Sequence, residues 1–332
     1  MRQGTQEKTG GETAASRDVV IQVQNLAKSY GATRALTNVS FSVRAGEILA
    51  YLGPNGAGKT TTINILCGLL DRDAGQARVC GLDIAEDPVR VKQQIGVVPE
   101  ESNLYPELSC RRNLEYLGEL YGLPRTARKE RAESLLTLFD LSDKAAAPFR
   151  ALSRGLKRRL TVAAALIHSP QVVFLDEPTA GLDVPSARAL RSLIRTINRD
   201  GATVFLTTHN LAEAEALSHR ILILVRGRLV AEGTAVEIRR QVEKTRSLSV
   251  TLSADVSERM LRDACPDVRS ISLVEGAWRL EVTDVHRATA QLLSFADEHG
   301  VRILELNTST PSLEDAFMTI LEGDSGKEEA PP

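Results

Sequence analysis

The sequence has few cysteines, few aromatic residues and almost no net charge. Its four cysteines, Cys67, Cys80, Cys110 and Cys265, lie far apart and form no CxxC pair, which argues against a zinc ribbon or a disulfide framework. Forty-one Lys and Arg against 43 Asp and Glu give a formal net charge of −2, so no general basic surface for nucleic acid or anionic lipid is expected. We therefore predict buried or neutral thiols and no nucleic-acid partner.

Long hydrophobic runs are also missing. The stretch 160–175 is interrupted by His, Ser, Pro and Gln at 168–171, and it falls short of the roughly 20 apolar residues that a membrane-spanning helix needs. Residues 1–18 are polar, with no apolar run behind a basic start, so no secretory signal is indicated. These absences predict a cytoplasmic protein, with residues 1–18 as a disordered tail.

The 332 residues are enough for about two domains at roughly 150 residues each. Short strands near the start predict an antiparallel β edge, and the apolar strands that alternate with helices after them predict a mostly parallel sheet. Between residues 100 and 169 the pattern is helical only. The first domain is therefore expected to be an α/β domain over 19–240, with a helical subdomain inserted at about 100–169.

The pattern changes again beyond Glu243. Strand, helix, strand, strand, helix, strand is the order of a split βαβ, ferredoxin-like unit. We predict a small α+β extension over 244–322 and a disordered tail over 323–332. A dimer contact or a packing module is favoured for this extension over a regulatory ligand site, and the sequence does not decide between them.

The segment GPNGAGKTT at 53–61 matches the phosphate-binding pattern GxxxxGK[ST], directly after a predicted strand and at the start of a predicted helix. Its glycines let the backbone wrap a phosphate, and the N–H groups and helix dipole supply positive potential. Lys59 would reach the β and γ phosphates, and the hydroxyl of Thr60 can bind Mg²⁺. The predicted nucleotide-binding residues here are Gly53, Pro54, Asn55, Gly56, Ala57, Gly58, Lys59, Thr60 and Thr61.

Polar side chains follow two other predicted strands. Asp176 ends an apolar strand, where it would hold Mg²⁺ beside the phosphate loop, and Glu177 follows it as the base or polariser of an attacking water. His209 ends the strand TVFLTTH at the same sheet edge, where it could contact a γ-phosphate and fix that water. Glu177 and His209 are thus the predicted catalytic residues, and the other histidines are expected to be structural.

Together with LSRGLKRR at 152–159, these motifs make residues 19–240 resemble the ATP-binding subunit of an ABC transporter. The resemblance implies ATP and Mg²⁺ as cofactors. It also implies a head-to-tail dimer, with a second copy or a paralogous ATPase subunit, in which Ser153 and Gly155 of one protomer close over the ATP held by the other. Tyr30 would stack on adenine, and Asp183 belongs to the GLD loop that crosses the dimer interface.

The rest of the chain resembles the C-terminal extension of one branch, the subunits paired with ABC-2 type export permeases for drug or sodium efflux. The wording IGVVPEESNLYPELS at 95–109 and PSLEDAF at 311–317 supports that branch. The resemblance implies an integral-membrane permease as partner and a peripheral place on the cytoplasmic face of the membrane. The cleft beside residues 100–116 would receive a short cytoplasmic helix of the permease.

The chain departs from the family pattern at two places. Glu100 stands where most relatives carry Gln; it still offers an oxygen to Mg²⁺, with Thr60 and Asp176, but adds negative charge near the γ-phosphate. In the signature, Arg154 replaces the first Gly and Leu156 replaces Gln, while Ser153 and Gly155 remain. We expect a working signature.

Two other classes of P-loop protein fit the sequence less well. A soluble ABC protein acting on ribosomes or DNA would carry a second cassette, a long coiled coil or basic arms, and this chain has none of them. A P-loop GTPase or kinase would need an NKxD motif or a lid, and neither explains LSRG. A transport ATPase is the favoured function. Its cargo is not predicted, because the cargo path lies in another subunit.

Overall fold

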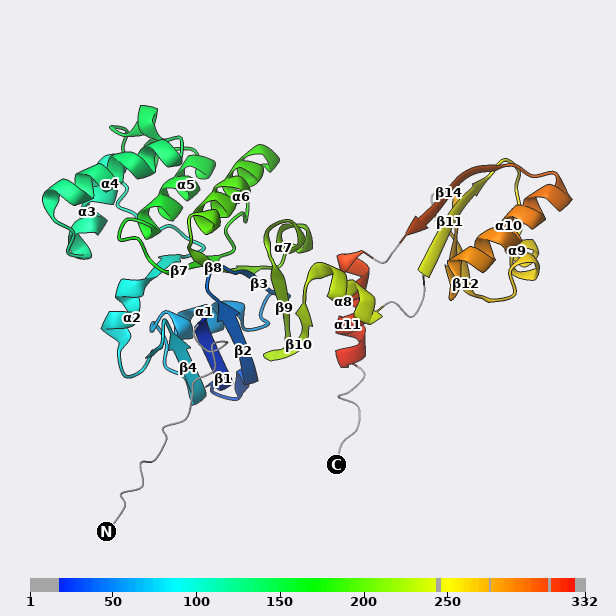
Figure 1. Cartoon of the computed structure of the whole chain (residues 1–332), viewed down its shortest axis with the longest axis horizontal. Coiled ribbons are helices and arrows are strands. Elements are labelled where there is room, and N and C mark those ends of the chain that lie inside the picture. The colour runs from blue at the N-terminus through cyan, green and yellow to red at the C-terminus, as the bar shows by residue number, and fades with distance from the viewer. Residues whose placement is uncertain (1–17, 243–245, 275, 310–311, 326–332) are drawn as a thin grey trace, which may run out of the picture. The chain divides into compact units, whose positions relative to one another are not determined.

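The computed structural model describes residues 18–242, 246–274, 276–309 and 312–325 (Figure 1). The tails expected at 1–18 and 323–332 fall almost wholly outside these residues, although 323–325 form the end of α11 (Leu313–Ser325). The chain divides into two compact units, Met1–Glu232 and Gly233–Pro332. This division precedes the boundary expected at 240–244, because α8 (Ala235–Val242) contacts α11 and so belongs to the second unit.

The first unit begins with an antiparallel sheet of four strands in the order β2-β1-β4-β5. Its strands are β1 (Val19–Tyr30), β2 (Thr33–Arg44), β4 (Ala74–Val79) and β5 (Leu82–Asp83). Residues of β1 and β2 alternate between buried and exposed over much of their length, as expected for a sheet with one face on the core. The predicted antiparallel edge is confirmed.

The second sheet has six strands in the order β10-β9-β3-β8-β7-β6. These are β3 (Ile48–Leu52), β6 (Ile95–Val98), β7 (Val172–Asp176), β8 (Thr203–Thr208), β9 (Arg220–Val225) and β10 (Arg228–Gly233). The pairs β3–β8, β3–β9, β6–β7 and β7–β8 are parallel. Every residue of β3, β7 and β8 is buried, which explains their continuous apolar sequences.

Four aromatic rings join the two sheets. Phe41 of β2 lies 5.7 Å from Tyr51 of β3 and 5.9 Å from Phe205 of β8, centroid to centroid. Phe205 also lies 5.5 Å from Phe174 of β7. These tilted contacts and the burial of the large rings anchor the strands whose ends carry the predicted site.

Helices of the first unit lie between these strands: α1 (Lys59–Leu66), α2 (Pro88–Gln94), α6 (Val184–Arg199) and α7 (Leu211–Leu217). The segment between β6 and β7 is helical, with α3 (Cys110–Leu120), α4 (Arg125–Leu138), two 3₁₀ turns (Ser142–Lys144 and Phe149–Ala151) and α5 (Arg154–Ala165). Figure 1 shows α3, α4 and α5 grouped on the side of this unit away from β1, β2 and β4. This group is the predicted helical insertion.

The second unit holds a four-stranded antiparallel sheet in the order β12-β13-β11-β14. Its elements are β11 (Arg246–Leu252), α9 (Glu258–Ala264), β12 (Val268–Val274), β13 (Ala277–Val282), α10 (Val285–His299) and β14 (Ile303–Ser309). Leu292 and Phe295 of α10 pack with Leu248, Leu261 and Leu280 in one buried cluster. The order and topology confirm the ferredoxin-like prediction.

The four cysteines are free. Burial raises the pKa of Cys80 to about 11 and raises the pKa of Cys67, Cys110 and Cys265 as well. The prediction of buried or neutral thiols is therefore confirmed. Among the described residues, no helix is long and apolar enough to span a bilayer.

Candidate functional site

The loop at 53–61 joins β3 to α1, and two of its glycines are required by close packing. Gly58 stands at the start of α1 with φ +107°, and a Cβ there would lie 2.5 Å from the carbonyl oxygen of Ala35. A Cβ on Gly53 would lie 2.3 Å from the carbonyl oxygen of Leu224. The backbone of β2 on one side and β9 on the other therefore leaves room only for glycine at these positions.

Lys59 is the first residue of α1, and its side chain is buried in the loop. Its Nζ donates to the carbonyl oxygens of Gly53 (2.7 Å) and Pro54 (3.1 Å). A buried ammonium is costly unless it is hydrogen-bonded or paired. Carbonyl oxygens of the loop thus stabilise the buried ammonium of Lys59.

The predicted carboxylates lie at the carboxyl end of β7. Asp176 is 6% exposed, pairs in register with Thr207 of β8, and its Oδ1 accepts a hydrogen bond from the Thr207 hydroxyl. Glu177 follows at φ +45°, and its N–H lies 3.2 Å from both the carbonyl oxygen and the hydroxyl oxygen of Thr207. The left-handed conformation of Glu177 ends the regular strand geometry, in which successive side chains point to opposite faces of the sheet.

The side chain of Glu177 lies between two other predicted residues. Its Oε1 is 3.5 Å from Lys59 Nζ, and its Oε2 is 2.9 Å from His209 Nδ1. The Glu177 side chain is 11% exposed, whereas that of His209 is 54% exposed. The sheet edge therefore brings together the phosphate-loop lysine and both predicted catalytic residues.

A cavity of about 400 Å³ opens at this point. Its lining residues are Ala35, Asn55, Gly56, Gly58, Lys59, Thr60, Thr61, Glu100, Glu177 and His209. All except Ala35 are predicted site residues. The exposed side chains of Thr60 and Glu100 offer oxygen ligands, and the carboxylate of Asp176 lies next to Glu177, so the residue types suit a magnesium nucleotide.

Eight predicted residues do not line this cavity: Gly53 and Asp176, described above, and Tyr30, Pro54, Ala57, Ser153, Gly155 and Asp183. Tyr30, at the end of β1, is 51% exposed, and Lys28 Nζ lies 5.9 Å from its ring centroid. Ser153 is an exposed N-cap of α5, and its Oγ accepts from the N–H of Leu156 at 3.4 Å. Pro54 and Ala57 belong to the loop but also lie outside the cavity lining.

The other two, Gly155 and Asp183, lie near the start of α5 and α6. A Cβ on Gly155 would lie 2.7 Å from Ser186 Oγ, and the Oδ1 of Asp183 accepts from the Ser186 N–H at 2.7 Å. Hydrogen bonds from Ser186 hold the pKa of Asp183 below its usual value. Arg154, one of the two signature departures, donates to the carbonyl oxygen of Ala180 at 3.3 Å.

Three residues that sequence reasoning missed support the site. Thr207 binds Asp176 and Glu177 as described. Arg158 donates to the main-chain oxygens of Glu100 and Glu177. Glu213 of α7 is 2% exposed and accepts from the Thr179 hydroxyl at 2.8 Å. The pairing of Thr207 with Asp176 could have been found by aligning the ends of neighbouring parallel strands, but Arg158 stands among other arginines with no separate signal.

Burial raises the pKa of Glu213, while hydrogen bonds from Thr208 and Thr179 oppose the shift. The negative charge of Glu177 raises it further. Because α7 directly follows His209, this carboxyl group links the histidine loop to the turn after Glu177. Glu213 is therefore a further buried acidic group beside Asp176 and the predicted catalytic residues.

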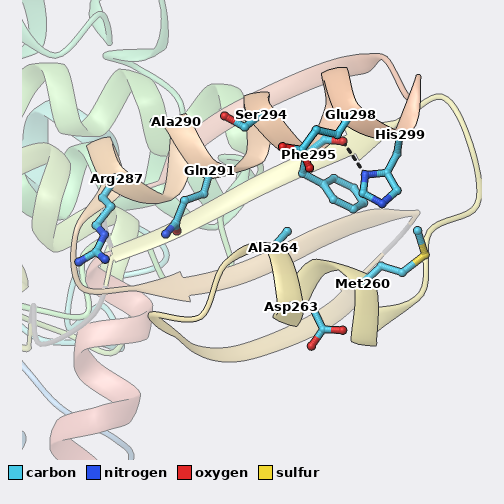
Figure 2. A pocket seen from close by; sticks show the side chains of 10 residues that line it. All are labelled: Met260, Asp263, Ala264, Arg287, Ala290, Gln291, Ser294, Phe295, Glu298 and His299. Carbon is cyan, nitrogen blue, oxygen red and sulfur yellow. Dashed lines mark hydrogen bonds between the residues drawn. The ribbon is translucent and has the colours of Figure 1, made fainter.

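A larger cavity, about 630 Å³, lies between α9 and α10 of the second unit (Figure 2). Phe295 is buried, Ala264 and Gln291 are half-buried, and the other lining side chains, such as Asp263 and Glu298, are exposed. It is therefore an open groove on the extension. It contains none of the motif residues, so cavity size alone does not identify the functional site.

Comparison with known families gives two matches. The family described as "ABC transporter" matches residues 36–180, and "ATP-binding protein DrrA1-3-like, C-terminal domain" matches residues 233–321. The first covers the phosphate loop, the signature and both carboxylates. The second covers the ferredoxin-like unit.

Several curated proteins are similar over almost their whole length. The linearmycin resistance ATP-binding protein LnrL of Bacillus subtilis is 33% identical over 305 residues, 91% of this chain and 98% of the relative. The doxorubicin resistance ATP-binding protein DrrA of Mycobacterium tuberculosis is 34% identical over 310 residues, 91% and 94% of the two chains. The Nod factor export ATP-binding protein I of Ralstonia nicotianae is 36% identical over 310 residues, 91% and 93%.

Solved structures agree. An ATP-binding subunit of an ABC transporter aligns with a TM-score of 0.62 at 34% identity, covering 67% of this chain and 93% of the other. An ATP-binding cassette in a dimeric post-hydrolysis state with ADP and Pi aligns with a TM-score of 0.60 at 27% identity, covering 64% and 98%. The chain belongs to the ABC transporter family, as an ATP-binding ATPase subunit of the branch that carries a DrrA-like C-terminal domain.

Proposed function

We propose that this chain hydrolyses ATP to drive a separate export permease in the membrane. The observation that carries the proposal is the placement of Glu177 between Lys59 and His209 in a cavity lined by the phosphate loop. Relatives named for linearmycin resistance, doxorubicin resistance and Nod factor export support an exporter. No substrate class is proposed for this chain, because the fold of the cassette does not identify the cargo.

In this proposal the loop amides and Lys59 bind the phosphates of ATP, and Glu177 accepts a proton from the attacking water. The water oxygen bonds to the γ-phosphorus as the bond to the β–γ bridging oxygen breaks, giving ADP and inorganic phosphate. His209, whose Nδ1 lies 2.9 Å from Glu177 Oε2, would contact the γ-phosphate and orient that water. Lys59, which lies in the same cavity, would balance the negative charge on the β and γ phosphates.

Magnesium fits the same place. Thr60, Glu100 and Asp176 would hold it, and it would supply positive charge at the β and γ phosphates. Thr60 and Glu100 line the cavity, and Asp176, which directly precedes the lining residue Glu177, accepts a hydrogen bond from the Thr207 hydroxyl. All three residues offer oxygen, the ligand type that Mg²⁺ prefers.

A second ATPase subunit, either a copy of this chain or a paralogue, would complete the site. Ser153 and Asp183 are exposed and lie outside the cavity of their own chain. This placement supports a head-to-tail dimer in which Ser153 and Gly155 contact the nucleotide of the partner. Tyr30, exposed at the end of its hairpin, would stack on adenine.

The permease would contact the segment after Glu100. Tyr105 is 48% exposed, and its ring lies 5.1 Å from that of Tyr116 in an edge-to-face arrangement. The N–H of Tyr105 donates to Asn113, which is fully buried. A rigid aromatic pair on a hydrogen-bonded loop suits a short permease helix, and it would place the subunit on the cytoplasmic face of the membrane.

Affinity purification from detergent-solubilised native membranes tests this proposal. The tagged full-length chain should recover an integral-membrane protein, identified by mass spectrometry, and the tag alone should not. A variant in which Tyr105 is replaced by Ala should recover less of it, while Leu293→Ala, an exposed residue of α10, should not change recovery. Recovery of ribosomal proteins in place of a membrane protein would contradict the transport function.

A further inference from the structure

The guanidinium of Arg158, in α5, is buried near the site and donates five hydrogen bonds. The residue is 8% exposed, although its guanidinium carries five N–H groups that all need acceptors. Five main-chain oxygens accept them, those of Pro99, Glu100 (3.0 Å), Asp176 (2.6 Å), Glu177 (3.1 Å) and Pro178 (2.9 Å). Every donor is therefore used, and every acceptor belongs to the backbone.

These five oxygens belong to two separate segments of the chain. One is the pair at 99–100 that follows β6, and the other is the turn at 176–178 that ends β7. Glu100 and Glu177 send their side chains into the ATP cavity, whereas Arg158 does not line it. The guanidinium thus binds the backbone of Glu100 and Glu177 without lining the cavity that their side chains enter.

The helix that carries Arg158 begins at the signature. Ser153 is the N-cap of α5, and Arg158 follows about one turn later. A displacement of α5 would therefore move the group that fixes Glu100 and Glu177. In a head-to-tail dimer the same helix presents Ser153 to the partner's nucleotide, so one element would sense one ATP and position the carboxylate that acts on the other.

We propose that Arg158 is a positioning residue that fixes Glu177 relative to Glu100 and links both to the signature helix. The inference rests on the proposed role of Glu177 as the base. Lysine cannot replace Arg158 in this role. The three donors of a lysine radiate from one nitrogen and cannot reach both segments as a planar guanidinium does. The contribution of Arg158 is thus its shape as well as its charge.

The test uses the purified full-length chain and its variants Arg158→Lys and Arg158→Met. We expect kcat for ATP hydrolysis to fall by roughly 10- to 100-fold, since small displacements of reacting groups cost that much. The KM and the calorimetric affinity for ATP should stay within about threefold, because Arg158 does not contact the cavity. The matched control is Arg159→Met, whose native side chain pairs with Asp140 at 3.4 Å near the surface; it should keep the wild-type rate.

Three results would overturn the inference. Wild-type kcat in Arg158→Lys would show that charge alone suffices, and loss of ATP affinity in proportion to kcat would show general support of the pocket. An equal loss in Arg159→Met would show a nonspecific effect of the helix. If Arg158→Met gives no folded protein, as judged by melting temperature and gel filtration, Arg158→Lys alone decides.

Glu177→Gln, measured in parallel, separates this inference from the proposed function. An inactive Glu177→Gln with normal Arg158→Lys turnover rejects the positioning role but leaves the base assignment intact. An active Glu177→Gln rejects the base assignment itself, and with it the reason for Arg158 to matter.

Discussion

Nδ1 of His209 lies 2.9 Å from Oε2 of Glu177. The other carboxylate oxygen faces Lys59 at 3.5 Å, so one carboxylate connects the strand end of β7, the loop after β8 and the phosphate loop. The side chain of His209 is half-exposed, whereas that of Glu177 is largely buried, and the Glu177 backbone is hydrogen-bonded to Thr207 and Arg158. Glu177, the proposed base, is therefore the more buried and more extensively bonded member of the pair.

Replacing Glu177 by Gln should keep ATP binding and nearly stop turnover. The amide keeps the size of the side chain but loses the basicity needed to accept a proton, so we expect a rate loss of about 10²- to 10⁴-fold. Phosphate release and calorimetric ATP affinity measure the two effects. Glu86→Gln, an exposed residue outside the cavity, is the control.

With ATP and Mg²⁺, Glu177→Gln should also accumulate as a dimer on size-exclusion chromatography. Persistence of the monomer, or unchanged steady-state hydrolysis, would contradict the assignment of Glu177.

Lys59→Ala should weaken ATP binding itself. The ammonium is already desolvated in the loop by bonds to two carbonyl oxygens, so it can contact phosphates without further desolvation, and charge-assisted bonds are the strong ones. Loss of such contacts corresponds to roughly 10- to 100-fold in affinity. Calorimetry of the variant against Lys92→Ala on α2 measures it; equal affinities would reject the loop's role.

Variants of Glu100 test whether this residue is a magnesium ligand or the catalytic base. If the residue mainly offers an oxygen to Mg²⁺ and senses the γ-phosphate, Glu100→Gln should keep substantial activity and Glu100→Ala should lose most of it. Glu86→Ala is the control, because this exposed residue lies outside both the cavity and the proposed permease segment. The rates are compared at saturating Mg²⁺ and ATP, with the permease present.

The opposite pattern would reverse the assignment. An inactive Glu100→Gln together with an active Glu177→Gln would make Glu100 the catalytic base.

Glu213→Gln should stabilise the fold at neutral pH. Burial raises the pKa of Glu213 above its ordinary value of 4.5, so the folded chain loses stability as pH rises from 4.5 through the raised value. An amide still accepts from Thr179 but has no charge to bury. We expect a gain on the order of 1 kcal/mol, or about 2–4 °C in Tm.

The gain should be present at about pH 7.5 and should vanish well below the ordinary pKa of 4.5, where Glu213 is protonated in both the folded and the unfolded chain. Thermal melts of the full-length chain at the two pH values measure it, with Glu86→Gln as control. A gain independent of pH would show that the effect does not come from ionisation.

The sequence by itself determined the elements of the site that are local in the chain. The strand, glycine loop and helix around Lys59, and the apolar strand that ends in Asp176 and Glu177, follow from short patterns whose chemistry is carried by neighbouring residues. The alternation of strands and helices determined the fold class for the same reason, because periodicity reflects which faces are buried. Parallel strands then bring Glu177 and His209 to one edge.

Only the tertiary structure decided which distant groups support those residues. Arg158 bonds to main-chain oxygens, which every residue possesses, so no pattern of side chains reveals that contact. The burial of Glu213 and the approach of Ala35 to Gly58 likewise depend on how separate elements pack. The division into two units depends on such a contact too, because α8 contacts α11, a helix some 70 residues further along the chain. Local chemistry can be read along the chain, whereas backbone contacts and burial arise only when segments far apart in sequence meet.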